Sequence, residues 1–223
     1  MEIALTAVCI AGLAALLFAE YRGHPRLRVA GKIVAALAFV MLGLEAFEIR
    51  GRDTQVFGLC IFGGLVFGAI GDVALLGHSK KAFLAGLVAF LIGHIGYVVA
   101  VAFVVAPRLW LGEAGIYAAL PVVVGGGALV VLWPRLGSMK VPVIVYVVTI
   151  VTMVIAALAV GRSAAIGEPH SCLFLAGASL FFVSDLAVAR NRFVARTFSN
   201  LAWGLPAYFS GQLLIAWSLV GLA

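Results

Sequence analysis

The sequence predicts an all-α fold, a bundle of eight transmembrane helices that forms one domain over residues 1–223. The chain is 65% hydrophobic and only 11% charged, and its mean hydropathy of +1.20 lies outside the range of soluble domains. Apolar runs of about 17 to 24 residues, long enough to cross a bilayer as helices, recur along the whole sequence. Short polar connections separate these runs and leave little room for a soluble domain.

The boundaries of the spans follow from these connections. The first apolar run has no basic segment before it and is followed by the charged stretch EYRGHPRLR, so we expect a spanning helix and not a cleaved signal peptide. Later runs are separated by the connections FEIRGRDTQ, GHSKK, APRL, PRLGSMK, GRSAAIGEPH and RNRFVARTF. The expected spans are 3–19, 30–47, 56–77, 82–105, 114–133, 141–160, 171–189 and 199–221.

The basic residues predict an orientation. Eleven of the fifteen Lys and Arg residues lie in the first, third, fifth and seventh connections, whereas only Arg50, Arg52, Arg108 and Arg162 lie on the other side. The positive-inside rule then places both termini outside and the odd-numbered loops in the cytoplasm, and we expect the inner (plasma) membrane of a bacterium. Because the cations form short clusters between apolar runs, they fit membrane orientation and not nucleic-acid binding.

Two spans resemble each other. GGLVFGAIGDVALL aligns without gaps on AGASLFFVSDLAVA and superposes Asp72 on Asp185. The two stretches lie in the third and seventh spans, four positions apart in the series, so they run in the same direction. In addition, Lys32 and Lys140 open the second and sixth spans. The pattern predicts a parallel four-plus-four repeat.

The two aspartates are candidate functional residues. An unpaired carboxylate in hydrocarbon is costly, so it either holds a proton or faces a wet cavity, and no basic residue of its own span lies within one turn of Asp72. Asp72 precedes His78 by six residues and Asp185 precedes Arg190 by five, which puts both about 7 to 9 Å inside the cytoplasmic helix ends. On neighbouring helices they would share a cavity as acid and base. Alternatively, each simply reaches cytoplasmic water.

A histidine lies on one face of the fourth span. Phe90, His94, Tyr97 and Val101 follow 4-3-4 spacing, so they share that face. His94 is a candidate base or hydrogen-bond donor, or else a satisfied core residue. Counting from Lys81 places it deeper in the membrane than the aspartates.

Other polar residues allow two interpretations each. Lys32 and Lys140 either snorkel to lipid phosphate or bind a substrate phosphate. Tyr146 with Met153 on the sixth span, and Tyr208 with Gln212 at i, i+4 on the eighth, are candidates to line a cavity. Alternatively, the tyrosines belong to aromatic belts or serve packing, although a buried amide such as that of Gln212 needs partners. Glycine patterns at Gly64-xxx-Gly68, at Gly93 with Gly96 and at Gly125 to Gly127 predict close helix approach.

The sequence also argues against several site classes. Cys9, Cys60 and Cys172 lie in apolar runs without CxxC spacing, so we expect neither a disulfide framework nor a metal site. P-loop, HExxH, GxSxG and SxxK motifs are absent from the sequence, which disfavours nucleophilic acyl transfer.

Taken together, five stretches resemble the YhhN family of membrane proteins, whose characterised members are lysoplasmalogenases. They are FGAIGDVALL, FLAGLVAFLIGHIGY, PVIVYVVTIVTMVIAAL, AGASLFFVSDLAVARNRF and YFSGQLLIAWS, in this order over nearly the whole chain. Lys32 also fits, although Ile33 replaces a proline that often follows this lysine in the family.

The resemblance implies an eight-helix enzyme that hydrolyses the vinyl ether of lysoplasmenyl-ethanolamine or lysoplasmenyl-choline to a fatty aldehyde and a glycerophospho-alcohol. Such chemistry needs a carboxylic acid and a second carboxylate, roles that Asp72 and Asp185 can fill in either order, and no cofactor. His94, Tyr97, Tyr146, Tyr208 and Gln212 would orient water or substrate, and Lys32 or Lys140 would meet the phosphate. The expected partners are the lysophospholipid and membrane lipids, with no protein partner evident.

Two other functions compete with this one. A proton-coupled transporter or lipid-handling protein would use Asp72 and Asp185 as coupling sites. An intramembrane aspartyl protease is suggested by the glycine-aspartate pair in GAIGD. However, Asp185 follows Ser184 where those enzymes have a tyrosine, and their proline-rich motif is absent from the sequence.

Overall fold

The computed structural model describes residues 1–46, 52–77, 79–163 and 165–222. Arg50, His78 and the predicted end of the second span at residue 47 lie outside these residues. The long helices are α1 (Glu2–Arg22), α2 (Pro25–Glu45), α3 (Arg52–Ala74), α4 (Lys80–Val104), α6 (Ala119–Leu132), α7 (Lys140–Arg162), α8 (His170–Phe193) and α9 (Phe198–Trp217). A short α5 (Trp110–Ala114) and the 3-10 turns η1 (Pro107–Leu109), η2 (Gly115–Ala118), η3 (Trp133–Arg135) and η4 (Gly137–Met139) lie around α6.

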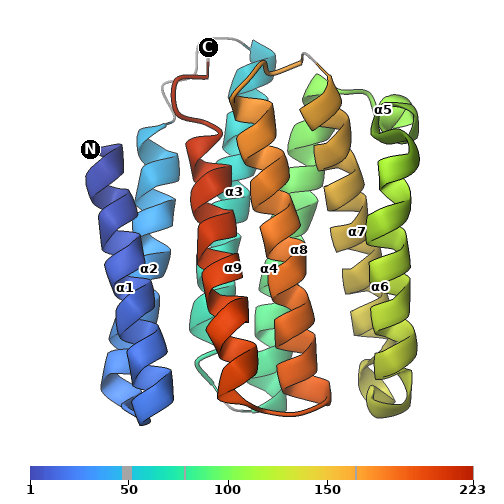
Figure 1. The fold of residues 1–223 in the computed structure, drawn as a ribbon. Coiled ribbons are helices and arrows are strands. Elements are labelled where there is room, and N and C mark those ends of the chain that lie inside the picture. Colours follow the sequence, from blue (N-terminus) through green and yellow to red (C-terminus); the bar gives the residue numbers. More distant parts are fainter. Residues whose placement is uncertain (47–51, 78, 164, 223) are drawn as a thin grey trace.

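The long helices stand side by side in a bundle, with α1 and α6 on opposite sides (Figure 1). Both ends of the chain lie at the same end of this bundle (Figure 1). The other end, the lower one in the view, carries the connections α1–α2, α3–α4, α6–α7 and α8–α9, and we call it the basic end because most cations cluster there. All regular structure in the described part of the chain is helical, so the predicted fold class, a polytopic helical bundle, is confirmed.

Seven helical segments among the described residues are long and apolar enough to cross a membrane, and α9 is not one of them. Its polar residues, which include Asn200, Ser210 and Gln212, lower its hydropathy. It nevertheless runs alongside α8 through the bundle (Figure 1). An eighth crossing by α9 stays a prediction, as do the single domain and the four-plus-four repeat.

The fifth predicted span, 114–133, is not one continuous helix. Gly115 has a φ of +55°, a backbone conformation that few residues other than glycine adopt, and it ends α5 and begins η2. The following α6 has 14 residues, which makes it about 21 Å long. The sequence pattern missed this break because the whole stretch is apolar.

At the seventh predicted span the helix is longer than expected. α8 ends at Phe193 and not at residue 189, because the helical backbone continues through the polar segment. Arg190 and Arg192 therefore lie on the last turn of a helix and not in a loop. Because both arginines are on the same helix as Asp185, helical periodicity sets their directions relative to it.

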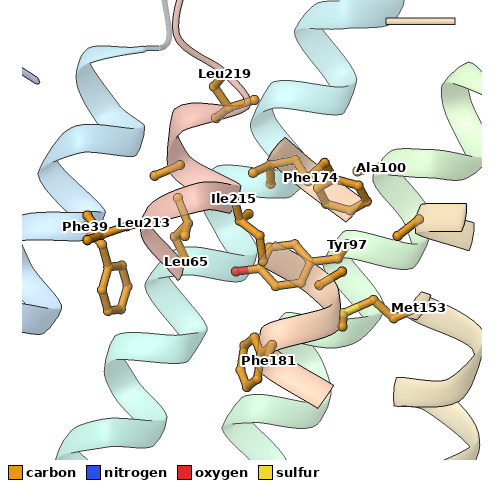
Figure 2. Packing of buried hydrophobic residues seen from close by; sticks show 14 of the residues in the cluster. Phe39, Leu65, Tyr97, Ala100, Met153, Phe174, Phe181, Leu213, Ile215 and Leu219 are labelled. Carbon is orange, nitrogen blue, oxygen red and sulfur yellow. The ribbon is translucent and has the colours of Figure 1, made fainter. Parts of the chain in front are cut away.

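The core lies between α2, α3, α4, α7, α8 and α9. Figure 2 shows side chains from these helices meeting at the centre of the bundle, among them Tyr97, Phe174 and Phe181. Met153, which we expected beside Tyr146 in a cavity, is instead fully buried in this core. The outer surface is also apolar: Val130 and Val141 are 75% and 70% exposed, as expected for side chains that face lipid.

Glycines set the closest helix contacts. A Cβ on Gly177 of α8 would lie 2.7 Å from the carbonyl oxygen of Gly211 on α9, and a Cβ on Gly93 of α4 would lie 3.0 Å from that of Gly64 on α3. The predicted close approach at Gly64 and Gly93 is therefore confirmed. At Gly126 and Gly127 a Cβ would meet nothing within 4 Å, so the prediction for these two positions is wrong.

The α8–α9 contact yields a stability prediction. Replacing Gly177 by Ala should force α9 away from α8 and lower the stability of the purified protein by about 1 to 3 kcal/mol, the usual cost of overpacking. Thermal unfolding in detergent measures the effect. Gly63→Ala on α3 is the matched control, because a Cβ there meets nothing within 4 Å. Equal unfolding temperatures for the two variants would contradict the assigned contact.

Candidate active site

A cavity of about 180 Å³ lies near the basic end, between α1, α2, α3, α4, α8 and α9. Both Asp72 and Asp185 line it, so the predicted shared cavity is present. Its other lining residues include Lys32, Phe90, Phe181 and Tyr208 deep inside, and Arg28, Arg192 and Arg196 toward the basic end. We call it the polar cavity.

The predicted equal depth of the two aspartates is wrong. Asp72 is two residues from the end of α3 at Ala74, whereas Asp185 is eight residues from the end of α8. The helices α3 and α8 pack mainly against α4 and α9, respectively, and not against each other.

Asp72 forms a buried ion pair with a lysine from the preceding helix. The Nζ atom of Lys32 on α2 lies 3.1 Å from Oδ1 of Asp72 on α3, and the two side chains are 9% and 3% exposed. The snorkelling interpretation of Lys32 is therefore wrong, because its ammonium group turns inward. The other carboxylate oxygen, Oδ2, has no hydrogen-bond partner among the described residues.

A chain of hydrogen bonds leads to Asp72 from the core. The Tyr97 hydroxyl donates to Oε1 of Gln212 at 2.8 Å, and Nε2 of Gln212 donates to the Tyr208 hydroxyl oxygen at 3.3 Å. The Tyr208 hydroxyl also interacts with the side chain of Asp72. Gly68 of α3 leaves the space for the Gln212 amide, which a Cβ would overlap.

Asp185 has a different set of neighbours. The Tyr146 hydroxyl of α7 donates a hydrogen bond to Oδ2 of Asp185 at 2.8 Å. Nε2 of His94 lies 3.8 Å from the same oxygen, and neither ring nitrogen of this fully buried histidine has a hydrogen-bond partner in the described part of the chain. His94 is thus beside Asp185, and the depth argument that separated them is wrong, because α8 continues to Phe193 and Asp185 lies deeper in it than the sequence indicated.

Aromatic rings line the polar cavity together with the carboxyl groups of Asp72 and Asp185. The rings of Phe90 and Phe181 meet edge to face with centroids 5.9 Å apart, and the Tyr208 ring lies 5.7 Å from Phe90 and 5.1 Å from Phe181. The His94 ring lies 4.5 Å from that of Phe181. Apolar rings around the carboxyl groups strengthen the electrostatic interactions inside the cavity.

The glycine before Asp72 has a steric role. A Cβ on Gly71 would lie 2.8 Å from the ring of Phe90 on α4. The glycine therefore lets Phe90 pack across the helix next to Asp72. A residue with a side chain before Asp72 would collide with the Phe90 ring, so glycine suits this position.

Two arginines flank the α8–α9 turn at the mouth of the polar cavity, Arg192 on the last turn of α8 and Arg196 after it. Oδ1 of Asn191 accepts the backbone N–H of Thr197 at 3.1 Å, and Nδ2 of Asn200 donates to the carbonyl oxygen of Ala195 at 2.6 Å. These bonds fix the turn between Arg192 and Arg196.

The cations at this mouth differ in their surroundings. Nε of Arg28 is paired with Oε1 of Glu20 at 2.6 Å, so its charge is already balanced. The guanidinium of Arg192 lies 4.6 Å from the centre of the Phe83 ring, and both Arg192 and Arg196 are exposed at the cavity mouth. These two arginines are the better candidates for an anionic ligand.

Lys140 is not brought to this cavity. Its Nζ atom lies 4.5 Å from the centre of the Trp133 ring, and the residue does not line the polar cavity. As the first residue of α7 it lies at the helix end, six residues before Tyr146. Tyr146 is the seventh residue of α7, close to the position that Lys32, the eighth residue of α2, has on its helix.

Four contributors to the site escaped the sequence analysis. Phe181 precedes Asp185 by four residues and Arg192 follows it by seven, so helical periodicity places both on its face. Phe90 was seen as a neighbour of His94 only, and Arg196 lies in the turn, where periodicity gives no signal. Among the described residues, no three His, Cys, Asp or Glu side chains gather closely enough to hold a metal ion.

Comparison with known proteins identifies the family of this chain. The YhhN family profile matches residues 27–219. The chain belongs to the YhhN family. No solved structure matches it significantly.

Several YhhN relatives carry a functional name. Lysoplasmalogenase TMEM86A of Bos taurus is 36% identical over 165 residues, and its human counterpart is 35% identical over 162 residues. Each match covers 72% of this chain and 65% of the relative's own length. A Mycobacterium bovis protein named lysoplasmalogenase is 30% identical over 197 residues, which are 86% of this chain and 68% of that protein.

The buried ion pair of this YhhN protein yields a second prediction. Lys32→Met should destabilise the protein by about 3 to 5 kcal/mol, because it leaves the Asp72 carboxylate buried without a counter-charge. The double variant Lys32→Met/Asp72→Asn should recover most of that loss. Thermal unfolding in detergent measures both.

Lys80→Met is the control, since this lysine is exposed and bonds only Ser138 among the interactions described for it. If the double variant were no more stable than Lys32→Met alone, the two side chains would not depend on each other as assigned.

Proposed function

We propose that this protein is a membrane hydrolase that cleaves the vinyl ether bond of a lysoplasmalogen to give a fatty aldehyde and a glycerophospho-alcohol. The observation that carries the proposal is the pair of carboxyl groups in one cavity, Asp72 beside a cation and Asp185 beside a phenol. The names of the curated relatives support the same reaction.

The reaction needs acid catalysis at carbon. A carboxylic acid gives its proton to the alkenyl carbon that is second from the oxygen, and the positive charge moves to the first carbon and the oxygen. Water adds to the first carbon and loses a proton to a carboxylate. The resulting hemiacetal breaks its bond to the glycerol oxygen, which is protonated, so that one water is consumed and aldehyde and alcohol leave. No covalent enzyme intermediate is required.

The neighbours of the two carboxyl groups suggest their roles. Asp72 lies 3.1 Å from the Lys32 ammonium, which stabilises its ionised form, so it suits the carboxylate that faces the developing cation and activates water. Asp185 has no lysine or arginine in contact among the described residues; its neighbours are the Tyr146 hydroxyl and the His94 ring. It suits the proton donor, with Tyr146 orienting the carboxyl group.

The ends of the polar cavity suggest how the substrate lies. A glycerophosphate head would enter at the basic end, where Arg192 and Arg196 offer guanidinium groups that match phosphate geometry. Lys32 is engaged by Asp72, so it contributes to the phosphate only through its charge. Tyr208, held by Gln212, would orient the water or a glycerol hydroxyl near Asp72.

The orientation of the bundle belongs to the same proposal. The positive-inside rule favours a basic end that faces the cytoplasm, so the polar cavity would open to the cytoplasmic leaflet. The inner membrane of a bacterium stays a prediction.

A direct assay tests the proposed function. Purified protein should release aldehyde from lysoplasmenyl-ethanolamine and no fatty acid from the ester-linked lysolipid. Asp185→Asn should lower kcat by about 10²- to 10⁴-fold, the usual contribution of a general acid. Mass spectrometry of both products measures the two reactions.

Glu113→Gln is the matched control, because it also exchanges a carboxyl for an amide but lies in α5, outside the polar cavity. Retention of full activity in Asp185→Asn would refute the role of that residue. Cleavage of a peptide, or accumulation of lipid across vesicles without any product, would refute the function as a whole.

A further inference from the structure

A second cavity adjoins the polar one on the other side of Asp185. It has a volume of about 60 Å³ and lies between α4, α6, α7 and α8. Its wall is made mostly by aliphatic and aromatic side chains, and it includes Phe90, Gly125, Tyr146, Val147, Phe182 and Asp185. We call it the apolar cavity.

Among the residues that the structure describes, Tyr146 and Asp185 alone bring polar side chains to this wall, and the Tyr146 hydroxyl donates a hydrogen bond to Asp185 at 2.8 Å. Asp185 and Phe90 also line the polar cavity, so the two spaces meet at this carboxyl group. A molecule with its polar part in one space and its apolar part in the other would pass Asp185 at the boundary between them.

We propose that the apolar cavity binds the start of the hydrocarbon chain of the substrate, and that Gly125 determines how much chain it admits. The inference rests on the proposed function, in which the bond to be cleaved lies between a phosphate-bearing head and an alkenyl chain. With the head in the polar cavity and the chain in the apolar one, the alkenyl carbons lie beside Asp185. Burial of the chain's methylene groups, each worth about 0.8 kcal/mol, then holds the bond there.

Gly125 lies in this wall, where α6 packs against α7. A Cβ there would lie 2.7 Å from Val151 and 3.2 Å from Val147, both on α7, and 4.0 Å from the ring of Phe182. Any side chain at this position must therefore enter the space between α6, α7 and α8 or push these helices apart. At the next residue, Gly126, a Cβ would meet nothing within 4 Å, because that side of α6 faces outward.

The experiment compares lysoplasmenyl-ethanolamine carrying a long alkenyl chain with an analogue carrying a propenyl group. The wild-type protein should prefer the long chain. In Gly125→Leu the ratio of kcat/KM for long to short should fall at least about tenfold, which equals about 1.4 kcal/mol of lost chain binding. Gly126→Leu adds the same side chain to the outer face and should keep the wild-type ratio.

A second variant covers the case in which Gly125→Leu does not fold. Val147→Ala enlarges the same cavity, so it should raise the relative kcat/KM for a chain with a methyl branch near the double bond. The inference is overturned if Gly125→Leu keeps the wild-type ratio, or if Val147→Ala leaves the preference for branched chains unchanged.

The same comparison is made by binding, with a non-hydrolysable alkyl-ether lysolipid and its short-chain analogue. If the wild-type protein released no aldehyde from any substrate, the proposed function would fail while the binding ratio still tested the cavity. If aldehyde is released but neither ratio responds to Gly125→Leu, the chain lies elsewhere and the proposed function stands without this inference.

Discussion

The fold depends on how two carboxyl groups are accommodated inside an apolar bundle. Asp72 is held by the Lys32 ammonium of the preceding helix at 3.1 Å, and Asp185 by the Tyr146 hydroxyl of the preceding long helix at 2.8 Å. A buried charge or polar group without such a partner would cost several kcal/mol, roughly the size of a small protein's net stability. The pairing of α2 with α3 and of α7 with α8 is therefore constrained by chemistry as well as by packing.

The two arrangements are similar in position and different in charge. One carboxyl group faces a lysine ammonium and the other faces a phenol and an imidazole, and we propose that this difference lets two identical side chains take opposite parts in proton transfer. The tyrosine and glutamine network around Asp72 and the aromatic rings around Asp185 keep each environment distinct. Glycines such as Gly68 and Gly71 make the network fit, because they leave room for the Gln212 amide and the Phe90 ring.

Much of this arrangement is predictable from the sequence, because membrane burial imposes strong patterns. The length of the apolar runs predicted the helical bundle, and the two aspartates within the spans predicted a shared cavity. The partners of these aspartates were harder to predict, since Lys32 had two plausible directions and periodicity within α2 does not say which neighbour it meets. The expectation that Lys140 reaches the site was wrong, because the comparison of the second and sixth spans matched residue types and not depths. Tyr146, and not Lys140, takes the place on α7 that Lys32 takes on α2. The apolar cavity beyond Asp185 arises from four helices, and no local pattern reports it.

The most direct test of this account is hydrolysis of lysoplasmenyl-ethanolamine in heavy water, with the aldehyde trapped at once by reduction to the alcohol. If a carboxyl group protonates the alkenyl carbon, the product carries one deuterium on the second carbon and forms more slowly than in ordinary water. An aldehyde without deuterium, produced at the same rate in both solvents, would contradict the assignment of acid catalysis to the carboxyl pair.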